Sequence, residues 1–215
     1  VRVMGKLISY GERLCEPGDE SSWDFVRGGI LSVLTVGVSW TVGWLLIRGA
    51  RAVHPIVGTL IEIALAWTTL ATGSLLSETG SVVSALESRR LQQARDSLSM
   101  IVGRDTQQLG ESEIARAVIE TVAEGLCDGV IAPLLYLVVG GVPLALAYKG
   151  VNTLDSMIGH PEHPHTYFGR FAARCDDVAS FLPARLTALA IIMAAAICGG
   201  SAQDATRTWL SDGHK

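Results

Sequence analysis

Four long apolar runs, separated by polar stretches, dominate the pattern of this sequence. They span about residues 29–47, 55–76, 129–147 and 182–201. The first contains no charged residue, and as a helix it reaches about 28 Å at ~1.5 Å per residue, enough to cross the hydrocarbon core of a bilayer. The pattern therefore predicts an all-α, polytopic integral membrane protein: a helical bundle of about four apolar segments with amphipathic helices between them. We expect residues 1–215 to form a single membrane domain.

Three of the runs contain residues that disturb a simple span. Glu62 interrupts the second, and because a buried carboxylate is costly we expect it to face protein, to pair with another group or to lie near the membrane interface. The third contains Pro133, Gly140-Gly141 and Pro143, which break or kink a helix. It predicts either one bent span or a re-entrant pair of short helices. The fourth is reached through Leu182-Pro183-Ala184-Arg185.

Composition supports this prediction and narrows the classes of function. Hydrophobic residues make up 49% of the chain and charged residues 18%, against about 25% charged in an average soluble domain, and the mean hydropathy is +0.37. The net charge of −4 shows no basic excess that would indicate nucleic-acid binding. The four cysteines form no C-x-x-C pair, so neither a zinc site nor a redox motif is indicated.

Charge also predicts an orientation. For four simple crossings, eleven Lys and Arg lie on one side and six on the other, which places the N-terminus and residues 77–121 in the cytoplasm. Four simple crossings would put the two polar segments described next on opposite sides. If those segments form one site, the broken third run must return to the side from which it starts.

The first polar segment is residues 87–128, whose polar positions recur at helical spacing. Ser112 is expected to cap a helix in which Arg116, Glu120, Glu124 and Asp128 step by four residues along one stripe. Three acids on one stripe repel each other unless a cation or a basic partner lies among them, so Mg²⁺ or an arginine is implied. Periodicity alone is equally typical of a solvated face with Arg116 as the local counterion.

The second polar segment, residues 148–158, follows the third run. As a helix it groups Lys149, Asn152, Thr153 and Ser156 on one face. A lysine, an amide and hydroxyls in this grouping suit a phosphate or carboxylate ligand. The alternative is a lysine that only extends to the membrane interface.

Three shorter features carry weaker signals. Residues 102–106 predict a turn, in which Gly103 permits a positive φ and Arg104 and Asp105 offer an opposite-charge pair. Residues 174–177 set Asp176 and Asp177 beside Arg174, a pattern found in divalent-cation sites and in ordinary helix caps. Residues 160–165 hold three histidines, His160, His163 and His165, but two intervening prolines forbid helical ligand spacing, so we expect a surface loop rather than a metal site.

Taken in order, these strings resemble one known family. They are LSMIVGRDT (98–106), ETVAE (120–124) with DGVIAP (128–133), YK (148–149) with VNTLDSMIG (151–159), and Arg174 with Asp176-Asp177 and LPARLT (182–187). Each is modest alone, but the four in this order resemble the adenosylcobinamide-phosphate synthase family of cobalamin biosynthesis. The resemblance runs along the whole chain and implies that further family segments precede residue 1 and follow residue 215.

The resemblance implies a multi-pass protein of the cell membrane that joins 1-aminopropan-2-ol, or its O-phosphate, to a propionate carboxylate of adenosylcobyric acid. ATP and Mg²⁺ are consumed in activating the carboxylate, and other membrane proteins of the pathway are possible partners. By residue type, it assigns catalytic roles to Asp105, Glu120, Glu124, Lys149 and Asp177. It assigns cofactor binding to Arg104, Asn152, Arg174 and Arg185, and metal binding to Asp128, Asp155 and Asp176.

Two other classes of function stay open. In a transporter, Glu62 and the broken third run would form a site near the membrane midplane. A non-catalytic membrane protein of signalling or assembly would have no need of a complete phosphate- and metal-binding set. The polar clusters of this sequence flank the apolar runs, which favours the enzyme.

Overall fold

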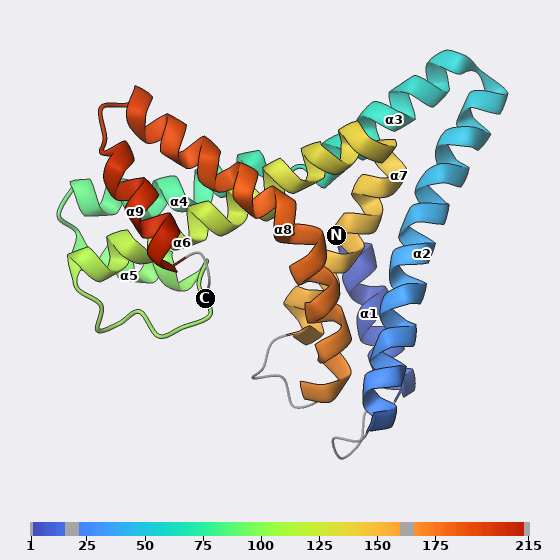
Figure 1. Ribbon diagram of the computed structural model, residues 1–215, viewed down its shortest axis with the longest axis horizontal. Coiled ribbons are helices and arrows are strands. Elements are labelled where there is room, and N and C mark those ends of the chain that lie inside the picture. Colours follow the sequence, from blue (N-terminus) through green and yellow to red (C-terminus); the bar gives the residue numbers. More distant parts are fainter. Residues whose placement is uncertain (1, 16–21, 160–165, 213–215) are drawn as a thin grey trace. The chain divides into compact units, whose positions relative to one another are not determined.

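The computed structural model describes residues 2–15, 22–159 and 166–212, and all regular structure within them is helical (Figure 1). Four stretches are long and apolar enough to cross a membrane: Trp23–Val53, Pro55–Glu87, Glu111–Gly159 and Tyr167–Ile197. They contain nearly all of the four predicted apolar runs. The prediction of an all-α polytopic membrane protein is confirmed.

The chain divides into two compact units, each of which is described by itself. Unit 1 comprises Val1–Leu70 and Ala132–Leu182, and unit 2 comprises Ala71–Ile131 and Pro183–Lys215. The predicted single domain over residues 1–215 stays a prediction. The histidines at positions 160, 163 and 165 lie outside the described residues.

Unit 1 contains α1 (Arg2–Cys15), α2 (Ser22–Val53), α3 (Pro55–Thr69), α7 (Ala132–Leu154), a π-helical turn η2 (Asp155–Gly159) and the first part of α8 (Thr166–Ile197). The helices α2 and α3 form a hairpin that turns at His54. The His54 ring accepts a hydrogen bond from the N–H of Ile56 at 3.2 Å, and Pro55 occupies the first turn of α3, where its missing N–H has no cost.

The core of unit 1 lies where α1, α2, α7 and α8 meet, around Leu31, Leu154 and Phe168. A Cβ atom at Gly28 would lie 1.9 Å from the carbonyl oxygen of Phe168, so only glycine lets α2 approach α8 this closely.

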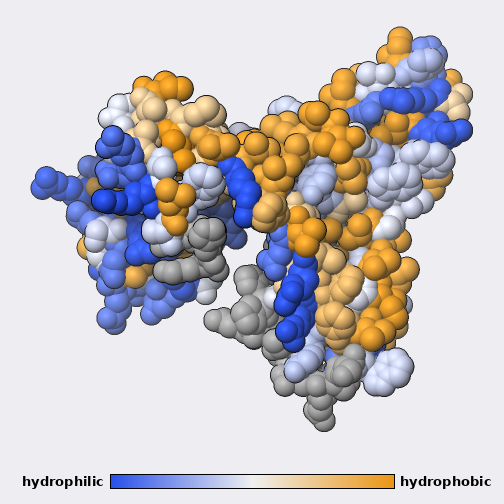
Figure 2. Space-filling model, viewed as in Figure 1, coloured by the Kyte–Doolittle hydropathy of each residue, from blue (hydrophilic) through white to orange (hydrophobic). Residues whose placement is uncertain are grey.

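Large apolar side chains remain exposed along the outer faces of α2, α3 and α8, and Figure 2 shows hydrophobic surface over these helices. Such a surface suits contact with lipid. Members of this set are Val33, Leu34, Leu45, Leu60, Ile63, Leu189 and Met193.

The third apolar run is broken as the sequence predicts. Within α7 the backbone leaves helical geometry at Gly140 (φ −143°, ψ 18°) and Gly141 (φ 67°, ψ −167°), and the chain changes direction there (Figure 1). The second half of α7 then restarts at Val142, so Pro143 again falls in a first turn.

The fourth apolar run differs from its prediction. We expected a span that begins near Pro183, but α8 passes through this proline without interruption from Thr166 to Ile197. Proline lacks the N–H that would bond to the carbonyl of Ala179 four residues earlier. The hydroxyl of Tyr136 on α7 donates to that carbonyl at 2.9 Å instead. An outside donor therefore lets the helix continue, so Asp176 and Asp177 lie inside a long helix rather than at its cap.

Unit 2 contains α4 (Thr72–Glu87), α5 (Leu91–Ser99), α6 (Glu111–Leu126), a π-helical turn η1 (Cys127–Ile131), the rest of α8 and α9 (Ala202–Asp212). A buried cluster that includes Val82, Leu98 and Ile114 joins α4, α5 and α6. The second apolar run is not one helix, because Leu70 is extended between α3 and α4. The N–H of Ala71 that this break leaves unused donates to the carbonyl of Gly129 at 2.9 Å.

We predict that Gly141→Ala lowers the free energy of unfolding by about 1–3 kcal/mol, because this combination of φ and ψ is reached almost only by glycine. The measurement is reversible unfolding of the purified protein in mixed micelles. The matched control is Gly37→Ala inside α2, where an added Cβ meets nothing within 4 Å and stability should stay the same or rise by up to about 1 kcal/mol. Equal losses at both positions would contradict the prediction.

Candidate functional site

The predicted site residues are shared equally between the two units. Unit 1 holds Lys149, Asn152, Asp155, Arg174, Asp176 and Asp177, and unit 2 holds Arg104, Asp105, Glu120, Glu124, Asp128 and Arg185. Each group is therefore described within its own unit.

In unit 1, the second half of α7 fixes the direction of a lysine side chain. Lys149 and Asn152 lie one turn apart, and the ammonium donates to the amide oxygen at 3.2 Å, with both side chains half-buried. Asp155 follows at the start of the π-helical turn η2. The hydroxyls of Thr153 and Ser156 donate to helix carbonyls of Lys149 and Asn152, at 2.6 and 2.8 Å. The predicted shared face of Lys149 and Asn152 is present.

A chain of hydroxyl groups, which sequence reasoning missed, holds Asp176. Ser180, one turn later on α8, donates to one carboxylate oxygen at 3.2 Å, and the Ser180 and Tyr148 hydroxyls lie 3.4 Å apart. The Tyr148 ring stacks on Tyr136 with ring centroids 4.9 Å apart. The i, i+4 spacing of Asp176 and Ser180 is a signal that could have found the first of these contacts. Asp176 is thus half-buried in a polar network at the contact of α7 and α8.

The other two predicted residues of α8 point elsewhere. Asp177 is exposed, because successive residues of a helix differ by about 100° in direction. Arg174 is exposed as well and lines a separate pocket of about 410 Å³ together with Phe25, Tyr167 and Arg170. The lining of that pocket includes neither Lys149 nor Asp176.

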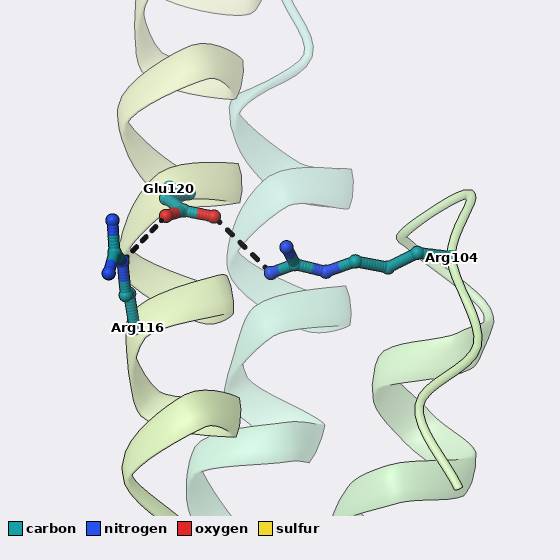
Figure 3. A network of polar contacts seen from close by, with 3 residues as sticks. All are labelled: Arg104, Arg116 and Glu120. Atoms are coloured by element: carbon teal, nitrogen blue, oxygen red, sulfur yellow. Dashed lines mark hydrogen bonds and ion pairs between the residues drawn. The ribbon is translucent and has the colours of Figure 1, made fainter. Parts of the chain in front are cut away.

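In unit 2, one glutamate lies between two arginines (Figure 3). Glu120 receives Arg116 at 3.0 Å on one carboxylate oxygen and Arg104 at 3.3 Å on the other. Arg116 is the predicted i, i+4 neighbour on α6, whereas Arg104 comes from the loop before α6. These side chains are between 51% and 79% exposed, so each pair alone contributes no more than about 1 kcal/mol to stability.

Two side-chain hydrogen bonds hold the loop at residues 100–110 against α5. Thr106 is buried and its hydroxyl donates to the carbonyl of Arg95 at 2.9 Å, while the Arg95 side chain donates to the carbonyl of Leu109 at 3.0 Å. Asp105 accepts from the N–H of Gln107 at 2.9 Å, which closes a tight turn. The loop is therefore a fixed platform for Arg104.

Three features that the sequence offers in unit 2 are not used in the structure. The positive-φ glycines among the described residues are Gly141 and Gly199, so Gly103 does not use this conformation. Arg104 pairs with Glu120 and not with its neighbour Asp105. The helix α6 is capped at Gly110, whose N–H donates to Glu113 at 2.7 Å, and not at Ser112.

The predicted acidic stripe is only partly realised. Arg116 and Glu120 are paired, and Glu124 is exposed one turn later. Asp128 lies in the π-helical turn η1, whose wider turn changes the angular register and takes this residue out of line. Arg185 lies on α8, half-buried, two residues after Pro183. Within the described residues, no group of three or more His, Cys, Asp or Glu could hold a metal ion.

Glu62, the carboxylate inside the second apolar run, forms an ion pair. It pairs with Arg51, which lies near the end of α2, across the hairpin. Glu62 is the middle residue of α3, seven residues from Pro55 and seven from Thr69. Of the placements expected for this carboxylate, pairing with another group is the one that the structure shows.

Comparisons with known proteins give a consistent result. A family model described as CobD/Cbib protein matches residues 1–215. A cobalamin biosynthesis protein CobD of Geobacter metallireducens is 49% identical over 213 residues, which are 99% of this chain and 66% of that protein. A cobalamin biosynthesis protein CbiB of Salmonella typhi is 45% identical over 201 residues, 92% of this chain and 62% of that protein. The chain thus spans about two thirds of the length of these relatives. No solved structure matches.

We predict that Thr106→Val loosens the platform under Arg104. The substitution keeps the volume but removes the hydroxyl that donates to the carbonyl of Arg95, so the free energy of unfolding should fall by about 0.5–1.5 kcal/mol. Amide hydrogen exchange should rise over residues 100–110. The control is Thr72→Val, at an exposed position in the first turn of α4, which should change neither quantity. Unchanged exchange in the loop of Thr106→Val would refute the anchoring role.

Proposed function

The chain belongs to the CobD/Cbib protein family, and we propose that it acts in cobalamin biosynthesis as the enzyme that amidates a corrinoid. The reaction joins 1-aminopropan-2-ol, or its O-phosphate, to a propionate carboxylate of adenosylcobyric acid at the expense of ATP. The product is adenosylcobinamide or its phosphate. The protein works as a multi-pass protein of the cell membrane, in keeping with the four membrane-length apolar stretches among its described residues, and other membrane proteins of the pathway are its expected partners.

One observation carries this proposal: the motif residues provide cationic and anionic groups that are held by specific hydrogen bonds. Lys149 is oriented by Asn152, and Glu120 lies between Arg104 and Arg116. A ligase of this kind must bind several anions, namely the phosphates of ATP and the substrate carboxylate, and must also accept a proton from an ammonium group. A transporter or a scaffold needs no such pairing of fixed cations and bases.

The chemistry has a defined balance. Condensation of a carboxylate with an ammonium ion in water is uphill, and ATP overcomes this if its γ-phosphoryl group is transferred to the carboxylate, which releases ADP. The amine nitrogen then attacks the acyl carbon, the amide bond forms and inorganic phosphate leaves. The nitrogen gives up two of its three protons to a basic group, which passes them to phosphate and solvent. The sum is carboxylate, ammonium and ATP converted to amide, ADP, hydrogen phosphate and one proton.

The cationic residues stabilise the negative charge of this sequence. Lys149, Arg104, Arg174 and Arg185, with the amide of Asn152, bind phosphate oxygens and the substrate carboxylate. Arginine offers two parallel donors to such groups, while lysine provides a compact charge that follows the transferred phosphoryl group.

The acidic residues divide between two tasks. Both oxygens of Glu120 accept from arginines, so its part is to position Arg104. Asp105, Glu124 and Asp177 are exposed carboxylates and can take the proton from the ammonium.

Magnesium reaches the site with ATP. A nucleotide-bound Mg²⁺ needs only one or two protein carboxylates besides phosphate oxygens and water. The candidates for this role are Asp155 and Asp176 in unit 1 and Asp128 in unit 2. The ion neutralises phosphate charge when it is bound.

We predict that Asp105→Asn and Asp177→Asn each abolish amide formation, because an amide side chain cannot accept the proton. Membranes that contain the protein in its full-length natural form are supplied with adenosylcobyric acid, aminopropanol O-phosphate and Mg-ATP, and product and ADP are measured by mass spectrometry.

The control is Asp204→Asn, an exposed aspartate on α9 outside the motifs, which should keep its turnover. All three variants should remain in the membrane fraction in equal amounts. Turnover retained by Asp105→Asn or Asp177→Asn would remove that residue from the site. Wild-type membranes that form no amide and leave ATP intact would end the proposal.

A further inference from the structure

A pocket of about 330 Å³ lies in unit 1, at the hairpin end of α2 and α3, and takes no part in the proposed reaction. Three segments line it: the end of α2, Glu62 of α3 and the break in α7. The lining residues are Trp44, Ile47, Arg48, Arg51, Glu62, Gly140, Gly141 and Pro143.

The charged groups of this lining leave one net positive charge. Arg51 pairs with Glu62. Arg48 lies over the Trp44 ring, with its guanidinium carbon 5.1 Å from the ring centroid, and no carboxylate in the described part of the chain pairs with it. This cation–π contact orients the Arg48 side chain without using its N–H donors. The pocket therefore suits a singly charged anion.

The position of the pocket points to the membrane surface. Arg48 and Arg51 lie within six residues of His54, where the chain turns from α2 into α3. Large apolar side chains near these arginines in the sequence, such as Leu45 on α2 and Leu60 on α3, are exposed. Figure 2 shows hydrophilic surface beside hydrophobic surface at this end of the hairpin. Tryptophan and arginine at the end of a span are typical of the interface between lipid tails and head groups.

The break in α7 supplies a second, independent indication of a polar occupant. Non-helical backbone leaves N–H and C=O groups unpaired, and beside lipid these groups are tolerated only where protein or a polar cavity surrounds them. Gly140 and Gly141 are non-helical and line this pocket. The volume is at the lower end for ligand pockets, which suits a head group and excludes a corrinoid macrocycle.

We propose that this pocket binds the phosphodiester of an anionic membrane lipid. The single charge of a phosphodiester matches the net charge of Arg48, Arg51 and Glu62, and the guanidinium of Arg48 donates to its oxygens. The acyl chains extend from the pocket along the exposed apolar faces of α2 and α3. A free phosphate has the same kind of oxygens but a higher charge and no apolar part, so it fits the pocket and the apolar helix faces beside it less well.

The test uses the purified protein and native mass spectrometry with three ligands: phosphatidylglycerol, phosphatidylcholine and inorganic phosphate. Wild-type protein should retain phosphatidylglycerol in preference to phosphatidylcholine. Arg48→Gln should weaken phosphatidylglycerol binding about tenfold or more, because it removes a charge-assisted contact. Arg48→Lys, which keeps the charge and loses the planar fork, should lie in between. The matched control is Arg13→Gln on α1, an exposed arginine outside the pocket, which should bind as wild type does.

Arg48 is exposed and outside the hydrophobic core, so its variants should unfold at the wild-type temperature without lipid. Equal phosphatidylglycerol binding by Arg48→Gln and Arg13→Gln would overturn the proposal. So would inorganic phosphate that displaces the lipid at millimolar concentration, since the pocket would then be a soluble-anion site. Amide synthesis need not change in these variants, so this test stands apart from that of the proposed function.

Discussion

Each carbonyl group of an apolar helix needs a hydrogen-bond donor, and prolines inside such helices take donors away. The protein meets this constraint with donors from elsewhere in the chain. Pro183 leaves the carbonyl of Ala179 without its helical donor, and the Tyr136 hydroxyl supplies one at 2.9 Å. Pro133 cannot donate to the carbonyl of Gly129, which receives the N–H of Ala71 at 2.9 Å. Both donors come from segments distant in the sequence, so these helices depend on tertiary contacts for their continuity.

This dependence also organises the candidate site. Because α8 continues through Pro183, Asp176 lies inside a helix that contacts α7, and Ser180 and Tyr148 can hold it by a chain of hydroxyl groups. The same pair of tyrosines, Tyr136 and Tyr148, stacks in the contact between the two helices. One aromatic contact thus serves the backbone of α8 through one hydroxyl and the candidate acid through the other.

The sequence predicted those features that depend on local periodicity. The apolar runs predicted the four membrane-length stretches, and the two adjacent glycines predicted the break in α7. The i, i+4 spacing predicted the pair of Arg116 and Glu120. The sequence did not predict contacts between distant segments. Arg104 contacts Glu120, 16 residues later in the chain, and the Tyr148 hydroxyl lies near that of Ser180, 32 residues later. The sequence also did not predict that α8 continues through Pro183, because a proline reliably ends a helix only where no outside donor is available.

The central claim is that Tyr136 replaces the hydrogen bond that Pro183 cannot make. A double-mutant cycle measures this directly, with reversible unfolding in mixed micelles as the readout. Tyr136→Phe should cost about 1–3 kcal/mol in the natural chain, because it leaves the part-buried carbonyl of Ala179 without a donor. In a Pro183→Ala background the restored N–H bonds to that carbonyl, and the same substitution should cost less than half as much. An equal cost in both backgrounds would contradict the account.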